Sequence, residues 1–389
     1  MESGKKKFSK KAKKQKQRKS FRQRALAVLP VLLGSLFLTL LYSDTALFRK
    51  LGTTALDLNM SVRAPALSKN VTIVTITEDD YQKQFGGKSP LNPDELKKVL
   101  EAIAAAGPKA IGVDIDTSAS EFQNFVLPAG LPPVIWAREV RYSNRDETYR
   151  MFKVLGQQNP NQPYGAVTLK RDKDGAIRRY QRWYRVNNEV IPSLPWQIIQ
   201  VLRTGKSTQG NANESAEEML IDYPAPSKTH PFIQVPVSAV LEWSKQGFPE
   251  NNSLKGRVVL LGGDYAAGDE HDTPVGWMLG TEVLASIIET ELSGGGKKPA
   301  GVLVILLLII FDSVLLLLLL QLLGLWKTLV FSLGIIPVLA FVSSYLLFGS
   351  AAYIGYFLLV LTAILLHQLY EKGKEYLKKL KEQTAEQPQ

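Results

Sequence analysis

The most constraining feature of the sequence is the position of its long apolar stretches, which flank a polar centre. One stretch covers residues 25–42, and from residue 302 the chain is almost continuously apolar as far as residue 369. A transmembrane helix needs about 20 apolar residues. The pattern therefore predicts one large polar domain, residues 43–298, and four transmembrane helices at 25–42, 300–323, 327–348 and 351–369.

The basic residues predict how these helices are oriented. Residues 1–24 hold twelve Lys or Arg against one Glu, so this tail carries the whole net charge of +11. Segments rich in Lys and Arg stay in the cytoplasm, and Lys327 and the lysines of the tail 370–389 fit the same scheme. We expect a multi-pass protein of a bacterial inner membrane, with both termini in the cytoplasm and residues 43–298 outside it.

The N-terminal region has two alternative interpretations. A cleaved signal peptide would also begin with basic residues and an apolar stretch. The stretch 25–42 is longer than a usual signal core, and the LYSDTALFRK that follows lacks a small-x-small cleavage site, so a retained anchor is favoured. The basic tail 1–24 is poor in aromatic residues, and we expect it to bind anionic lipid headgroups and not nucleic acid.

Strand and helix signals alternate through residues 43–298. VTIVTI at 71–76 reads as a buried strand, LNPDELKKVLEAIAAAG as a helix capped by Asn92, and KAIGVDI as a second, parallel strand. Later segments predict a strand PPVIWA, a hairpin turning at Asp174-Gly175, a helix from Ser193, a strand EMLIDY, a helix VPVSAVLEWSKQG, a last strand GRVVLLGGD and a helix over 280–292. The expected fold is α/β, a mostly parallel sheet with βαβ units plus a hairpin insert, combined with the four transmembrane helices.

Acidic side chains collect where the expected strands end, and the stretch GGDYAAGDEHDTP after the last strand is the densest case. In open α/β sheets ligands bind at the carboxyl ends of parallel strands. A purely structural role, capping helices and tying loops, is the alternative for each carboxylate. The candidates for ligand binding or switching are Glu78, Asp79, Asp114, Asp116, Asp264 and Asp272.

Motifs for catalysis or cofactor binding are missing from the sequence. The acids after residue 262 do not have calcium-loop spacing, and no G-x-G-x-x-G, G-x-S-x-G or H-E-x-x-H pattern occurs. The chain has no cysteine, which excludes disulfides and thiolate catalysis and suits a bacterial envelope. We expect no catalytic residue and no cofactor, and leave open whether the acids bind a metal.

Two blocks of the sequence resemble the signature blocks of the CHASE domain, type 2. They are ITEDDYQKQFGGKSPLNPDELKKVLEAIAAAGPKAIGVDI and KGRVVLLGGDYAAGDEHDTPVGWMLGTEVLASIIETEL. The segment LDLNMSVRAP before the domain also resembles that family. So does the arrangement of one span before the domain and three after it. The sequence resembles cyanobacterial members most. The chain departs from the family pattern at Ser89-Pro90, Leu279 and Leu284.

The resemblance implies an extracytoplasmic sensory domain and no enzymatic activity. Relatives carry a catalytic output domain after the last span, and the 20 residues here are too few for one. We therefore expect a sensor for an unknown small molecule that signals through a partner protein or a second copy of itself. A membrane scaffold using the same fold is the alternative. The candidates for transferring the signal are Asp57, Arg63, Glu282 and Asp312.

Overall fold

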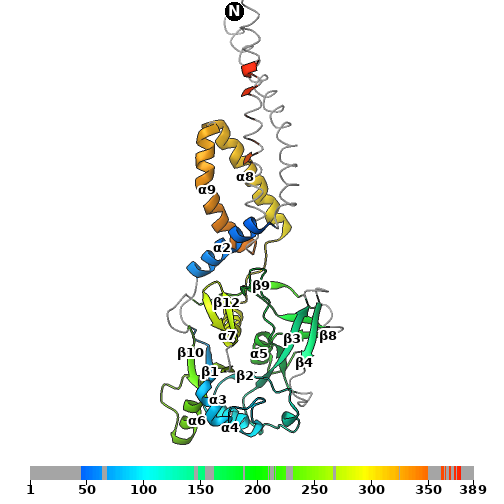
Figure 1. Cartoon of the computed structure of the whole chain (residues 1–389), viewed down its shortest axis with the longest axis vertical. Coiled ribbons are helices and arrows are strands. Elements are labelled where there is room, and N and C mark those ends of the chain that lie inside the picture. Colours follow the sequence, from blue (N-terminus) through cyan, green and yellow to red (C-terminus); the bar gives the residue numbers. More distant parts are fainter. Residues whose placement is uncertain are drawn as a thin grey trace, which may run out of the picture. The chain divides into compact units, whose positions relative to one another are not determined.

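The computed structural model describes residues 45–63, 68–143, 148–153, 162–186, 189–208, 216–224, 231–265, 269–323 and 325–348, with single residues and short pieces as far as 377. It divides into two compact units. The helical unit consists of Met1–Asn59 with Ala300–Gln389, and the sheet unit of Met60–Pro299. Figure 1 shows the elements of both units.

A nine-stranded sheet, counted over the described residues, forms the centre of the sheet unit (Figure 1). The strand order is β10-β1-β11-β2-β3-β4-β7-β8, with β5 paired to β3. The first five strands in this order are parallel, whereas β3–β4 and β7–β8 are antiparallel. The strands are β1 Val71–Thr77, β2 Ala110–Asp114, β3 Val134–Ser143, β4 Thr148–Lys153, β5 Tyr164–Ala166, β7 Trp183–Val186, β8 Glu189–Pro192, β10 Ile233–Pro236 and β11 Val258–Asp264.

Helices cover both faces of the parallel strands. Helices α4 (Pro93–Ala105) and α6 (Val237–Gln246) pack together with α3 (Glu78–Gln84) on one face, where Val259 and Leu261 enter the main apolar core. Helices α5 (Leu194–Thr204) and α7 (Gly280–Leu292) pack together on the other face. The predicted parallel α/β fold is therefore confirmed, although β11 lies between β1 and β2.

The start of α4 follows directly from its sequence. The Asn92 side chain accepts hydrogen bonds from the backbone N–H of Asp94 (2.9 Å) and of Glu95 (3.4 Å). Pro93 occupies the first turn, where a missing N–H costs nothing. Gly107 follows the helix with a φ of +76°, a conformation that glycine adopts without strain.

Replacing Asn92 with alanine is expected to lower the free energy of unfolding by about 1 kcal/mol, because two backbone donors of α4 lose their acceptor. Thermal unfolding followed by tryptophan fluorescence measures the change. Asn92→Asp is the matched control, since aspartate caps equally well and should leave the melting temperature near that of the wild type. Equal losses in both variants would show that the cap is not what stabilises this helix end.

The predicted hairpin at Asp174-Gly175 is only partly correct. The turn exists, with Gly175 at a φ of +93° and its N–H bonded to the Asp172 carbonyl at 2.9 Å. Its two arms do not pair with each other as strands, because β5 pairs with β3 and β6 (Arg179–Gln181) pairs with β9 (Glu218–Leu220). Alternation in a sequence indicates an extended segment but does not specify its partner strand.

The prediction that β11 is the last strand is wrong. An antiparallel pair, β12 (Glu270–Thr273) and β13 (Gly276–Leu279), follows it and leads directly into α7. Both strands are four residues long and polar in part, so their apolar periodicity is too short to be recognised. The tip is a tight turn in which Gly276 has a φ of +116°.

The helical unit contains α2 (Ala46–Arg63, as far as Asn59), α8 (Val302–Leu323) and α9 (Leu325–Leu346). The Asn59 amide donates to the Phe341 carbonyl at 2.8 Å, and the Ser344 hydroxyl donates to the Ala55 carbonyl at 3.2 Å. Helices α8 and α9 cover the predicted spans 300–323 and 327–348. The span at 25–42 and nearly all of 351–369 lie outside the described residues.

No helix among the described residues combines the length and the apolar character that a crossing of the membrane requires.

Candidate functional site

A cavity of about 340 Å³ lies at the carboxyl ends of β2 and β11 in the sheet unit. This is the edge of a parallel sheet at which α/β proteins bind their ligands. The volume is in the lower range of small-molecule sites. The lining residues are Asp114, Ile115, Asp116, Gly263, Tyr265, Asp269, Gly280 and Thr281.

Asp114, the last residue of β2, is the most perturbed acid of the cavity. Burial, together with the negative charge of Asp269, raises its pKa to about 7 although His271 opposes the rise. A carboxyl group in this position exchanges its proton near neutral pH. Asp116, two residues later, is exposed and accepts a hydrogen bond from the Ser118 backbone N–H at 2.9 Å.

Asp269 also lines the cavity, and His271 lies next to it. Asp269 Oδ1 lies 3.0 Å from His271 Nε2, and contact with this imidazole lowers the pKa of Asp269. Arg171 Nη2 lies 3.0 Å from His271 Nδ1. Since a guanidinium can only donate, Nδ1 accepts this bond and the proton of a neutral imidazole is on Nε2, the nitrogen that faces Asp269.

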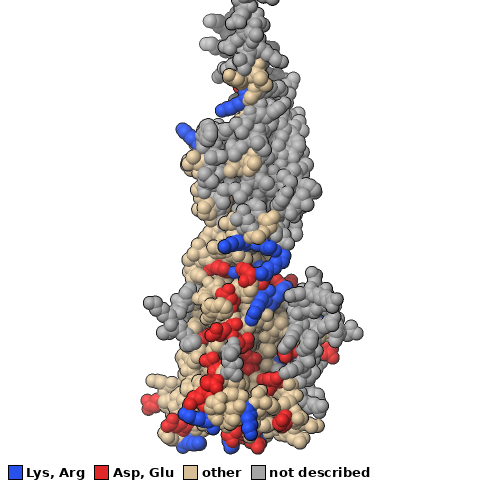
Figure 2. All heavy atoms as spheres, in the orientation of Figure 1, with Lys and Arg blue, Asp and Glu red and all other residues tan. Residues whose placement is uncertain are grey.

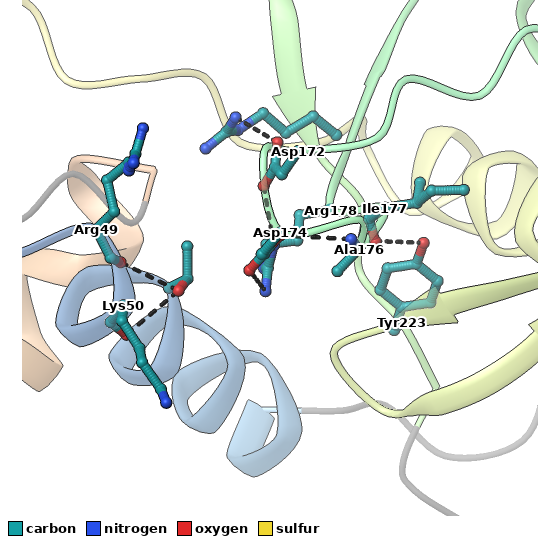
Figure 3. A network of polar contacts seen from close by, with 10 residues as sticks. Arg49, Lys50, Asp172, Asp174, Ala176, Ile177, Arg178 and Tyr223 are labelled. Carbon is teal, nitrogen blue, oxygen red and sulfur yellow. Dashed lines mark hydrogen bonds and ion pairs between the residues drawn. The ribbon is translucent and has the colours of Figure 1, made fainter. Parts of the chain in front are cut away.

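Polar contacts hold the turn at residues 172–178, which follows Arg171 (Figure 3). Arg178 is buried and binds Asp174 with two hydrogen bonds of 2.8 and 2.9 Å and Asp172 with one of 3.1 Å. The Ile177 N–H donates to the Asp272 carbonyl at 2.8 Å, and the Tyr223 hydroxyl donates to the Ile177 carbonyl at 2.9 Å. The backbone of β12 is thus fixed next to the cavity.

The pKa shifts of the two aspartates in this turn reflect their burial and their ion pairs. Burial would raise the pKa of Asp174, but hydrogen bonds from Arg178 outweigh it and lower that pKa. Burial dominates at Asp172 and raises its pKa although Arg179 and Arg178 oppose the change. The turn is therefore held together by a cluster of ion pairs and has a structural role.

Tyr265 and two glycines shape the remaining walls. The Tyr265 ring stacks on Tyr81 of α3 with centroids 4.3 Å apart and planes 12° from parallel. Burial raises the pKa of Tyr265 to about 12, so its phenol is neutral at pH 7. A Cβ at Gly280 would come within 2.4 Å of Asp269 Oδ2 and 3.3 Å of His271 Nε2. Only glycine leaves the cavity open at this point.

A larger and more open hollow of about 1140 Å³ lies beside α3 and α4. Its lining mixes Lys83, Lys88 and Lys97 with Asp94, Glu95 and Glu121, so it has no uniform charge. Lys98 and Lys83 are already paired in this region, with Glu95 and Asp79 at 2.7 Å each. We assign the site to the smaller cavity because its groups converge.

The structure brings two of the six predicted ligand or switch residues together, Asp114 and Asp116. Asp264 ends β11 and Asp272 lies on β12, and both are exposed outside the cavity lining. Glu78 and Asp79 are on the exposed face of α3, where Gln82 donates to Glu78 (2.9 Å) and Lys83 to Asp79 (2.8 Å).

Asp269, Tyr265 and Thr281 line the cavity and His271 contacts Asp269, but none of the four was among the predicted site residues. A signal for two of them exists in the sequence: Asp269 and His271 are two residues apart, and side chains with that spacing share one face of an extended segment. Tyr265 and Thr281 give no such signal, because a loop residue and a helix residue have no fixed direction relative to the sheet.

Glu282, one of the residues predicted to transfer the signal, lies at the start of α7. Its buried carboxylate accepts hydrogen bonds from the Leu279 backbone N–H at 3.0 Å and from the Gln234 amide at 2.9 Å. It therefore caps α7 and ties this helix to β10. Asp57 lies half-buried on α2, while the side chains of Arg63 on α2 and Asp312 on α8 lie outside the described residues.

Two acids at the other end of α7 bind other segments of the sheet unit. Glu289 accepts hydrogen bonds from the Asn70 N–H (2.8 Å), the Asn70 amide (2.9 Å), the Val71 N–H (3.0 Å) and the Ser68 hydroxyl. Glu291 is fully buried and accepts from the Tyr180 hydroxyl at 2.7 Å. Arg182 donates to both of its oxygens, at 2.7 and 2.8 Å.

A metal centre has no support in the described part of the chain. No group of three or more His, Asp or Glu side chains there is arranged to hold a metal ion. The polar side chains that line the cavity are three aspartates, the Tyr265 phenol and the Thr281 hydroxyl.

A comparison with known protein families identifies the family of this chain. Residues 31–325 match the CHASE2 domain, a family of extracytoplasmic sensory domains. No curated protein and no solved structure matches the chain. Because the match spans well over half of the 389 residues, the chain belongs to the CHASE2 family.

Proposed function

We propose that this protein is a membrane-anchored sensor whose sheet unit lies outside the cytoplasm. A small molecule occupies the cavity at the carboxyl ends of β2 and β11, α7 relays its presence, and a separate cytoplasmic or membrane partner produces the response. The family supports the sensory role. The apolar stretches and the basic tails of the sequence support the membrane anchoring, with the tail 1–24 on anionic lipid.

The observation that carries this proposal is the position of α7. Its first residues, Gly280 and Thr281, line the cavity. Near its other end Glu289 binds residues 68–71, the start of β1, and the chain leaves the helix toward residue 300. A helix of 13 residues is about 20 Å long and moves as one body. A shift at the cavity therefore displaces both connections of the sheet unit.

Close packing at the start of α7 makes this coupling direct. A Cβ at Gly262 of β11 would lie 2.0 Å from Thr281 Cγ2, so the Thr281 side chain of α7 rests directly on the backbone of the strand. Interfaces packed in this way respond to a ligand by discrete shifts and do not deform continuously.

A scaffold or assembly subunit is the second candidate. One observation favours it: Trp277 of β13 is 72% exposed. Exposed tryptophans are enriched at protein interfaces. The same residue also suits a contact with a signalling partner or with a second copy of the chain.

A topology experiment tests the membrane arrangement. A phosphatase that is active only outside the cytoplasm, inserted after the exposed Lys206, is expected to be active. Fusions before residue 20 and after residue 380 are expected to be inactive. The control inserts an enzyme that works only in the cytoplasm at the same three sites and should show the reverse. Cytoplasmic activity at Lys206 would overturn the proposed orientation.

Purification of the full chain in mild detergent separates the sensor from the scaffold. A sensor should retain a signalling enzyme whose rate changes between pH 6 and pH 8, and Glu289→Ala should keep the enzyme bound but remove this change. Glu242→Ala on the exposed face of α6 is the control and should leave the response intact. Retention of envelope assembly proteins without a regulated enzyme would favour the scaffold.

A further inference from the structure

We propose that helix α2 and the tip of the β12–β13 hairpin contact a lipid surface at the level of the headgroups. This inference rests on the membrane anchoring proposed above and adds the surface of the described chain that touches the bilayer. Helix α2 is continuous from Ala46 to Arg63, and only residues 43–45 separate it from the apolar stretch 25–42. A helix that follows a membrane span this closely begins at the membrane surface.

One side of α2 carries an exposed apolar stripe. Leu51, Leu58 and Val62 are 44%, 56% and 68% exposed. With 3.6 residues in each turn, Leu58 lies about two turns and Val62 about three turns after Leu51, so the three share one face of the helix. Leu56 and Met60, on another side of α2, are buried in the protein. The exposed stripe is therefore not part of the protein's core.

The β12–β13 hairpin brings an exposed tryptophan to the end of α2. The Ser61 hydroxyl donates to the Pro274 carbonyl at 3.3 Å, which ties the last turn of α2 to the tip of the hairpin within the sheet unit. Trp277, just after this tip, is 72% exposed. Tryptophan is enriched at membrane–water interfaces, where its ring is in apolar surroundings and its N–H meets water or headgroups.

Charge also favours lipid as the occupant of this surface. Helix α2 contains three basic residues, Arg49, Lys50 and Arg63, against the single acid Asp57, and Lys50 is exposed. Basic amphipathic helices lie on bilayers that contain anionic lipids. In the face drawn in Figure 2, acidic side chains are spread over the sheet unit, and anionic headgroups would repel such a surface. The lipid contact is therefore restricted to α2 and the hairpin tip.

The exposed apolar surface is too small for a stable interface between two copies of the chain. Each partner of a stable complex buries about 800 Å² from roughly 20–30 residues. The described parts of α2 and the hairpin expose only a few large apolar side chains, namely Leu51, Leu58, Val62 and Trp277. A bilayer requires no complementary surface, because each apolar side chain that leaves water contributes by itself.

Site-specific labelling of the full chain in lipid nanodiscs tests the contact. The sequence has no cysteine, so a Val62→Cys or Trp277→Cys variant takes up a single fluorophore. Nitroxide lipids with the spin label just below the headgroups are expected to quench either fluorophore at least about twofold, since interfacial helices bury their apolar face ~5–10 Å deep. Glu242→Cys on the exposed side of α6 is the control and should not be quenched. Helix α6 lies at the opposite end of the sheet unit from β12 in Figure 1.

Two results would overturn the proposal, provided that melting curves show the variants to be folded. Labels at Val62 and Trp277 that respond to dissolved iodide and not to the nitroxide lipid would place both side chains in water. Oxidation of Leu58→Cys or Val62→Cys in vesicles to a disulfide-linked dimer would place the stripe against a second copy, because a disulfide requires Cα atoms within about 7 Å. Either result, obtained while the phosphatase inserted after Lys206 is active, would remove the lipid contact and leave the proposed membrane anchoring in place.

Discussion

Replacing Glu291 with alanine is expected to lower the free energy of unfolding of the sheet unit by about 3–5 kcal/mol. Glu291 is fully buried and binds Arg182 through two hydrogen bonds, of 2.7 and 2.8 Å. The Tyr180 hydroxyl donates to the same carboxylate at 2.7 Å, and burial beside this negative charge raises the Tyr180 pKa. Removing the acceptor leaves a buried phenol and a guanidinium without a partner, which costs more than the bonds themselves contribute.

Tryptophan fluorescence during heating measures this loss, and a decrease of about 10 °C in melting temperature is expected for a unit of this size. Glu242→Ala is the control, since this glutamate lies exposed on α6 with Gln246 as its partner at 3.1 Å. It should change stability by no more than about 0.5 kcal/mol. Glu291→Gln keeps one acceptor and should fall between the two. A Glu291→Ala protein that melts with the control would contradict the assigned role.

Replacing Asp114 with asparagine is expected to stabilise the protein at pH 8 and to remove most of its pH dependence between pH 4 and pH 8. The folded-state pKa is raised to about 7 by burial, from a usual value of 3.8. Between these two values the folded state holds a proton that the unfolded state has lost. Stability therefore falls as the pH rises through this window, by up to about 4 kcal/mol.

Melting temperatures measured from pH 4.5 to 8.5 test this expectation. The wild type should melt progressively lower toward pH 8, whereas Asp114→Asn should change little and should melt higher than the wild type above pH 7. Asp116→Asn is the control, because Asp116 is exposed and should leave the slope in place. Asp269→Asn should move the slope to lower pH, since the Asp269 charge contributes to the raised pKa. An unchanged slope in Asp114→Asn would place the titrating group elsewhere.

Glu291 lies near the end of α7, whereas Asp114 lies in the cavity at the start of this helix. The two substitutions together therefore test whether α7 relays a signal from the cavity. If Glu291→Ala removes the pH dependence of the partner's activity while the partner stays bound, the far end of α7 is needed for output. Loss of the bound partner in the same variant would show that its effect is general unfolding.

Helix starts and stops could be predicted because they depend on residues within one turn. Asn92, Pro93 and Gly107 delimit α4, and Ser193 caps α5 by accepting from the Trp196 N–H at 3.3 Å. Each of these interactions spans three residues or fewer, apart from the glycine conformation that needs no partner at all. The parallel arrangement of β1 and β2 also follows from the helix between them.

Pairing of strands and completion of the site were decided by the tertiary structure. Strand β11 enters between β1 and β2 although it comes more than 140 residues after β2, and Arg182 meets Glu291 across 109 positions. Such contacts depend on which surfaces remain unfilled after the rest of the fold has packed. They cannot be inferred from the residue pattern of a short stretch of sequence. The α/β class, the capped helices and the acids at the end of β2 all follow from local patterns in the sequence. Only packing decided that Asp114 would face Asp269 and His271, because a side chain's neighbours across a cavity come from other elements.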